Sequence, residues 1–166
     1  REGPILEGDE RFTIMLSDDN GEHPEINLSR IVNKKFSLKN ETNAKTALWS
    51  VSNLNLLYLQ HHQTQNKIQG DKLHINSDRF FKEKKQRRNH EIYEALIYAL
   101  DAQHHLSYDD RRFYFDSIEQ IFLPIYYDGK SKIINQSQFL SNEELKKKVS
   151  IDAKNGSQNA MNLINN

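Results

Sequence analysis

Cysteine is absent from this chain of 166 residues. Disulfides, thiolate metal sites and cysteine nucleophiles are therefore excluded, whereas a cytosolic and an exported location are equally compatible with the composition. No apolar run approaches the roughly 20 residues that a membrane-spanning helix needs. The amino terminus also lacks the apolar core of a signal peptide. These absences leave the compartment open.

Apolar residues are scarce as well. They make up 36% of the chain and the mean hydropathy is -0.84, whereas a globular domain typically has roughly 45–50% apolar residues with glycine included. A chain of this length still buries a core, but we expect a thin one, together with a partner-binding surface or disordered ends. Lys+Arg and Asp+Glu both number 23, so net charge gives no argument for binding nucleic acid or an acidic membrane.

Two segments carry helical periodicity. The first begins after Asn40, a suitable N-cap, and places apolar residues three and four positions apart up to Tyr58. The second begins near residues 76–78 and continues to Leu100 with a wide apolar stripe, after a break expected around residues 87–89. A wide stripe predicts burial on more than one side. We therefore expect the second helix to be central and packed against the first, with a polar loop over residues 60–75.

The run from Phe113 to Gly129 is the most informative part of the chain. Aromatic and β-branched residues crowd two short runs on either side of the polar connector Asp116–Gln120, which predicts an antiparallel hairpin. The second run closes on Asp128-Gly129, where the glycine is expected to free the backbone so that the aspartate faces a cleft. The predicted fold class is therefore α+β, mainly helical, with a small antiparallel β-hairpin.

Both ends of the chain differ from this core in composition. We predict an amino-terminal extension with a strand pair over residues 1–39, a helical core with the hairpin over residues 40–136, and a polar helical or disordered tail over residues 137–166. Arg11–Leu16 is a strand candidate and Asn142–Val149 a helix candidate, whereas the Asn-, Gln- and Ser-rich sequence beyond Asp152 is expected to fray. Because the chain begins at arginine, we expect a processed product or a piece of a longer protein.

Three stretches carry a resemblance to a known family: Glu94–Leu100, the acidic loop Leu106–Asp116 and the closing Leu123–Gly129. Their order of helix, loop, hairpin and Asp-Gly resembles the carboxy-terminal lobe of kinase-like enzymes. In amino-acid sequence, these three stretches are most similar to the spore-coat CotH-like kinases, and more distantly similar to the HipA-like kinases. The resemblance implies an atypical protein kinase that transfers phosphate from ATP to a protein substrate with Mg²⁺ or Mn²⁺.

The resemblance also implies roles for particular residues. Asp128, followed by Gly129, matches the aspartate that holds the metal-nucleotide at the end of the hairpin, and Asp110 stands where a second polar metal ligand is placed. Mg²⁺ prefers such oxygen ligands and takes one or two carboxylates together with phosphate oxygens and water. Asp109 is the carboxylate nearest to the position of the catalytic base. His105 could accept a proton only if it is neutral and suitably placed.

Two parts of such kinases are missing from the sequence. There is no glycine-rich phosphate loop and no lysine in a Val-Ala-Ile-Lys-like strand. Either an amino-terminal lobe or a partner chain supplies them, or the protein binds without transferring phosphate. The alternative function is a non-catalytic helical interaction module of a larger assembly.

Each candidate also has a purely structural interpretation. Asp128-Gly129 can be a plain turn, and Asp109–Arg112 a solvated ion-pair cluster. The histidine pairs at 61–62 and 104–105 are expected to be structural or solvated, because adjacent side chains on a helix diverge by about 100°. The basic residues between 82 and 88 are expected to form a solvated face. A separation below roughly 6 Å between the Asp110 and Asp128 carboxylates would favour a metal site.

Overall fold

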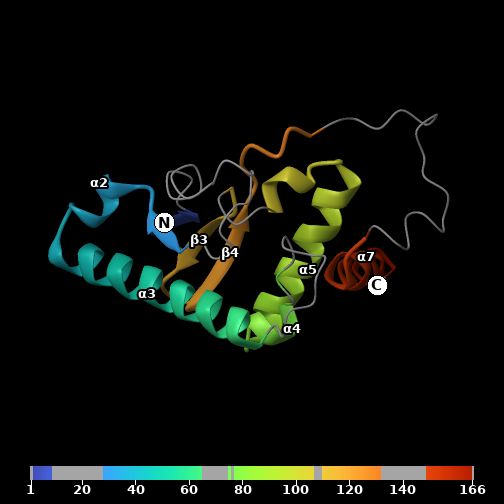
Figure 1. Cartoon of the computed structure of the whole chain (residues 1–166), viewed down its shortest axis with the longest axis horizontal. Helices are drawn as coiled ribbons and strands as arrows, with labels where there is room; N and C mark the ends of the chain where they lie inside the picture. Colours follow the sequence, from blue (N-terminus) through green and yellow to red (C-terminus); the bar gives the residue numbers. More distant parts are fainter. Residues whose placement is uncertain are drawn as a thin grey trace, which may run out of the picture.

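The computed structural model describes residues 2–8, 28–64, 75, 77–106, 110–131 and 149–165. Within them, helices are combined with a four-stranded antiparallel sheet, which confirms the predicted α+β, mainly helical class (Figure 1). In chain order the elements are β1 (Ile5–Gly8), β2 (Ser29–Ile31), α2 (Lys34–Ser37), α3 (Glu41–Thr64), α4 (Ser77–Phe80), α5 (Lys84–Ala99), the 3-10 helix η1 (Gln103–Leu106), β3 (Arg112–Asp116), β4 (Ile121–Ile125) and α7 (Ile151–Ile164). None of the described helices is both long and apolar enough to cross a membrane.

The sheet has the strand order β2-β1-β3-β4, and each neighbouring pair is antiparallel. β3 and β4 form the predicted hairpin, in which Phe113 pairs with Pro124. Asp116 closes the connector, because its Oδ1 accepts the backbone N–H groups of Ile118 and Glu119. The hairpin is therefore specified locally, by aromatic strands and by an aspartate suited to the turn.

Two strands within residues 1–39, β1 and β2, pair with each other. β1 lies between β2 and β3, so residues of the predicted extension share one sheet with the hairpin. The strand candidate Arg11–Leu16 lies outside the described residues.

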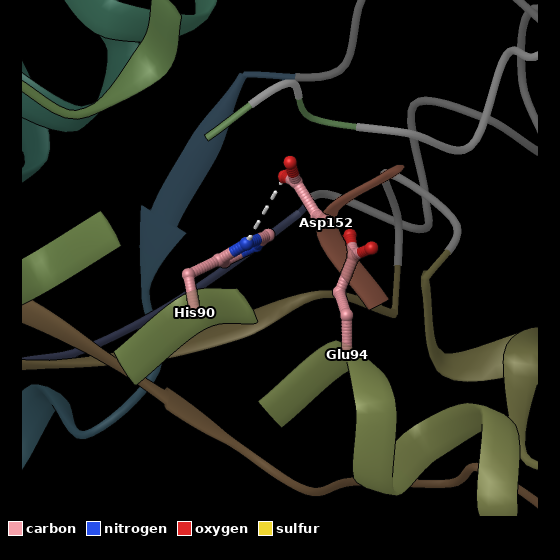
Figure 2. A group of neighbouring side chains, drawn as sticks. All are labelled: His90, Glu94 and Asp152. Atoms are coloured by element: carbon pink, nitrogen blue, oxygen red, sulfur yellow. Dashed lines mark ion pairs between the residues drawn. The ribbon is translucent and has the colours of Figure 1, made fainter. Parts of the chain in front are cut away.

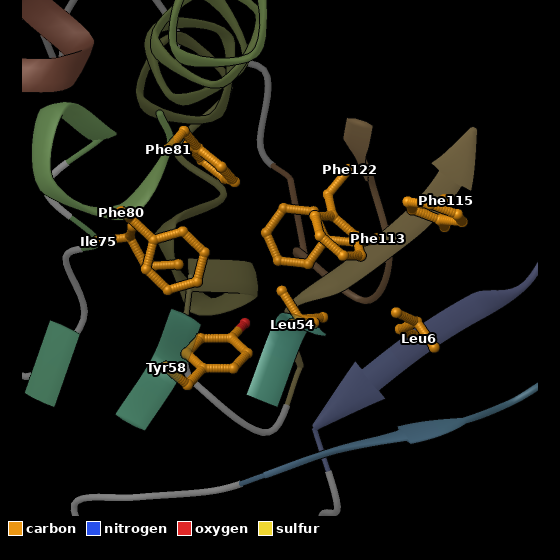
Figure 3. Packing of buried hydrophobic residues seen from close by; sticks show 9 residues of the cluster. All are labelled: Leu6, Leu54, Tyr58, Ile75, Phe80, Phe81, Phe113, Phe115 and Phe122. Atoms are coloured by element: carbon orange, nitrogen blue, oxygen red, sulfur yellow. The ribbon is translucent and has the colours of Figure 1, made fainter. Parts of the chain in front are cut away.

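An aromatic cluster between the sheet and α3 forms the main core (Figure 3). Alternate residues of β3 point to the same side of the sheet, and α3 contributes two residues four positions apart. Each member is at most 4% exposed: Leu6, Leu54, Tyr58, Ile75, Phe80, Phe81, Phe113, Phe115 and Phe122. Because burying one such side chain stabilises by roughly 1.5–3 kcal/mol, this cluster is what holds α3 against the sheet.

The first predicted helix is confirmed as α3. Asn40 is its N-cap, since its side-chain Oδ1 accepts the backbone N–H of Asn43 at 2.8 Å. The helix continues beyond Tyr58 to Thr64, so the expected polar loop is wrong for residues 60–64. Residues 65–74 of that loop lie outside the described residues.

The second predicted helix is divided into α4 and α5, with the break at residues 81–83 rather than at 87–89. The main neighbour of α5 is α7, and α3 packs instead against α2, α4 and β2. The expected packing of the two long helices against each other is therefore wrong. α5 is covered on more than one side, by α7 and β4, as expected. Of the predicted apolar stripe Ile97 is buried, whereas Leu96 is 56% exposed; the other buried residues of α5 are the polar Gln86, His90, Glu91 and Glu94.

The tail forms a helix where fraying was expected. α7 begins after Ser150, whose hydroxyl accepts the backbone N–H of Ala153 at 2.9 Å. Its Gly156 lies against the backbone of α5: a Cβ there would be 1.8 Å from the carbonyl oxygen of Glu91. Most of the helix candidate Asn142–Val149 lies outside the described residues, and Val149 itself is not helical.

Candidate metal site at the open end of the hairpin

The β3–β4 pairing brings the two predicted metal ligands together. Arg112 pairs with Ile125 where the hairpin opens, and Asp110 precedes this pair while Asp128 follows it. Their carboxylates and the imidazole of His104 each place a ligand atom within 4.8 Å of the others. This arrangement meets the separation that the metal hypothesis requires. Asp109, the candidate catalytic base, lies outside the described residues, so its role stays a prediction.

His104 joins this site although the sequence predicts only a structural or solvated role for it. It belongs to η1, and its Nε2 lies 3.3 Å from Oδ2 of Asp110 and 3.4 Å from Nζ of Lys130. The argument that neighbouring histidines diverge holds, because His105 is fully buried while the side chain of His104 is 51% exposed. Because the two side chains diverge, His104 and His105 cannot bind one metal ion together. His104 alone can do so with the aspartates.

His105 positions the site. Its Nδ1 lies 2.5 Å from the carbonyl oxygen of Tyr127, the residue before Asp128, and its ring packs against Tyr93 and Tyr126. The pKa of His105 is lowered to about 4, chiefly by burial and also by the neighbouring Arg111 and Arg112, whereas the hydrogen bond with Tyr127 raises it. The imidazole is therefore neutral near pH 7, but its burial keeps it from acting as a base on a substrate.

The side chain of Tyr127 is fixed as well. The Arg112 guanidinium stacks on its ring, 3.3 Å from the ring centroid, and the Nε of Arg112 donates to Oε1 of Glu7 at 2.7 Å. Cation–π contacts of this kind contribute about 0.5–2 kcal/mol. The residue before Asp128 is thus held through its backbone by His105 and through its ring by Arg112.

The backbone around Asp128 corrects the role predicted for Gly129. The left-handed residues are Asp128 itself, with φ 42°, and Lys130, with φ 48°; aspartate is among the few non-glycine residues that tolerate this region. Gly129 is needed for a different reason. A Cβ at this position would lie 2.6 Å from the ring of Tyr126. Glycine is therefore needed to avoid a clash with the ring of Tyr126. The orientation of Asp128 is set by its own left-handed backbone conformation.

The donor set of this site suits a divalent cation. Two carboxylates provide the oxygen ligands that Mg²⁺ and Mn²⁺ prefer, and the imidazole adds a nitrogen ligand that transition metals accept. The side chain of Asp110 is 12% exposed, and Asp128 is exposed. A cation could therefore reach the site from solvent and keep water or phosphate oxygens as further ligands.

No protein-family model, curated protein or solved structure matches this chain. The kinase resemblance therefore remains a prediction that rests on the residues named above.

The buried His105 predicts a specific pH dependence of stability. The pKa of His105 is 6.5 in the unfolded chain and about 4 in the folded protein. The stabilisation of the folded state by the neutral imidazole is therefore complete above pH 6.5 and is lost as the pH falls towards 4. The loss should be about 2–3 kcal/mol. Urea unfolding between pH 4.5 and 7.5 with EDTA present, on the wild type and on His105→Gln, measures it. Parallel profiles for the two proteins would contradict the prediction.

Proposed function

We propose that this chain is the metal-binding lobe of a kinase-like phosphotransferase that acts on a protein substrate with ATP and Mg²⁺ or Mn²⁺. The observation that carries the proposal is the convergence of Asp110, Asp128 and His104 at the open end of the hairpin. One aspartate stands before the hairpin and the other after it. Kinase-like enzymes present their metal ligands in the same order.

In this proposal the carboxylates of Asp110 and Asp128 hold the metal ion, which when bound supplies positive charge to the phosphates of the nucleotide. Lys130, next to His104, adds a positive charge beside the carboxylates. Asp109 is the proposed acceptor of the substrate proton. The contribution of the protein is thus positioning and electrostatic stabilisation.

We assign binding of the ATP phosphates to another lobe or to a partner chain, because the sequence contains neither the glycine-rich loop nor its lysine. Residues 1–166 alone should therefore bind the metal ion without transferring phosphate. Incubation with radiolabelled ATP tests this expectation. Labelling of the wild-type chain that disappears in Asp128→Ala would show that a second phosphate-binding element lies within these residues.

Replacing Asp128 with asparagine should weaken Mn²⁺ binding at least about tenfold, or about 1.4 kcal/mol, because the amide removes one ligand charge. Isothermal titration calorimetry with Mn²⁺, with and without ATP, measures the loss. Glu119→Gln is the matched control: it makes the same charge change in the connector, at the closed end of the hairpin, on a side chain that is 45% exposed. Equal affinities in the two variants would remove the hairpin metal site from the proposal.

One observation favours the alternative function of an interaction module. α5 and α7 border a mainly apolar groove of about 630 Å³, lined in part by the exposed side chains of Leu96, Met161 and Ile164. If neither Mn²⁺ nor Mn²⁺ with ATP bound to the wild-type chain, the kinase proposal would fail and the interaction module would be the better account.

A further inference from the structure

A second group of metal-ligating side chains lies between α5 and α7, apart from the hairpin site. His90 and Glu94 are four residues apart on α5 and therefore share one face of the helix, and Asp152 lies in the first turn of α7. Figure 2 shows the three side chains directed toward one another. Each offers a ligand atom within 4.8 Å of the others, and Nδ1 of His90 lies 3.8 Å from Oδ2 of Asp152.

All three side chains are buried. His90 is 2% exposed, Glu94 0% and Asp152 6%. Taking an ionised carboxylate out of water costs several kcal/mol unless charge compensates it. A divalent cation held by the three ligand atoms, which lie within 4.8 Å of one another, would supply such charge at this buried point. We propose that His90, Glu94 and Asp152 form a buried site for a divalent transition-metal ion, of the Zn²⁺ class, that joins α5 to α7.

The surroundings hold the two carboxylates in orientation. The hydroxyl of Ser150 donates to Oε2 of Glu94 at 2.6 Å, and the backbone N–H of Ser77 donates to Oδ2 of Asp152 at 2.7 Å. Hydrogen bonds of this kind orient the ligands in protein metal sites. The pKa of Asp152 is raised to about 6, chiefly by burial and to a lesser extent by the neighbouring Glu91 and Asp78, whereas the hydrogen bonds from Ser77 lower it.

The ligand types select the class of metal. One nitrogen and two carboxylate oxygens suit Zn²⁺ and similar ions, whereas Mg²⁺ and Ca²⁺ favour oxygen alone. With ligand bonds of about 2.1 Å, the ligand atoms of a tetrahedral Zn²⁺ lie roughly 3.4 Å apart. Because the three ligand atoms lie within 4.8 Å of one another, binding would draw them together by at most about 1.4 Å. Three protein ligands leave a fourth position for water or for a second carboxylate oxygen.

The experiment uses the whole chain after removal of metal with EDTA, with the hairpin site disabled by His104→Gln and Asp128→Asn. This double variant is loaded with Zn²⁺, passed through a desalting column and assayed for bound metal. We expect about one retained Zn²⁺ per chain and a higher melting temperature than in EDTA. A double variant that retains no Zn²⁺ would overturn the proposal, whatever the hairpin site does in the wild type.

Adding His90→Gln to that variant should reduce Zn²⁺ affinity at least about tenfold, and Asp152→Asn is the second substitution if the first does not fold. Retention of Zn²⁺ at unchanged affinity in a folded His90→Gln or Asp152→Asn protein would also overturn the proposal. Because the hairpin ligands are disabled throughout, the result is independent of the kinase-like function. Conversely, loss of Mn²⁺ binding in Asp128→Asn alone tests only the hairpin site.

Discussion

Replacing Glu7 with alanine should lower the free energy of unfolding by about 3 kcal/mol, the lower end of the cost of breaking a buried ion pair. Glu7 is 6% exposed on β1, and its carboxylate pairs with Arg112 on β3 and with Arg30 on β2. Without it, the guanidinium of Arg112, 19% exposed, would keep its charge with little water to solvate it. The lower end applies because Arg112 retains its contact with Tyr127 and Arg30 is 35% exposed.

Urea unfolding at pH 7.5 measures this loss, and Glu2→Ala is the matched control. Glu2 also pairs with a basic residue, Lys39, but these side chains are 72% and 61% exposed, so its removal should change stability by less than about 1 kcal/mol. If the two variants unfolded at the same urea concentration, the pairing of Glu7 would contribute no more than a surface ion pair.

Glu7→Ala should also weaken Mn²⁺ binding, because Arg112 holds the ring of Tyr127 next to Asp128.

The hairpin and its two aspartates could be predicted because the information is local. Aromatic strands on either side of a short connector determine the pairing, and antiparallel pairing alone brings Asp110 and Asp128 to one end. His104 could not be predicted in this way. Its place depends on how η1 turns after α5, and no fixed spacing links it to either aspartate.

The α5–α7 interface escaped prediction because its buried face is polar. Hydrophobic periodicity detects only apolar faces, whereas α5 buries Glu91, which accepts hydrogen bonds from the side-chain amides of Asn155 and Asn159 at 3.3 and 2.9 Å. The same asparagines made the tail resemble a disordered segment in composition. A polar sequence is compatible with a buried helix when its donors meet acceptors on the partner, and only the tertiary structure shows that they do.

Gly156→Ala should detach α7 from α5, although alanine favours an isolated helix over glycine by about 1 kcal/mol. The added Cβ would lie 1.8 Å from the carbonyl oxygen of Glu91, 2.2 Å from its carbonyl carbon and 2.7 Å from the nitrogen of Ile92. These are backbone atoms, so rotation of a side chain cannot relieve the overlap and the helices must separate. Overpacking of this kind costs about 1–3 kcal/mol or more, and the hydrogen bonds from Asn155 and Asn159 to Glu91 would be lost as well.

Amide hydrogen exchange across residues 151–164 and thermal unfolding measure the detachment. Ser157→Ala is the control, because this neighbouring position is exposed and alanine there should raise stability by a few tenths of a kcal/mol. An equal gain in Gly156→Ala would show that the two helices are not in close contact at this point. If they are, the moving helix also takes Asp152 away from His90 and Glu94. Retention of Zn²⁺ by the chain with its hairpin site disabled should then fall in Gly156→Ala, although none of the three proposed ligands has been changed.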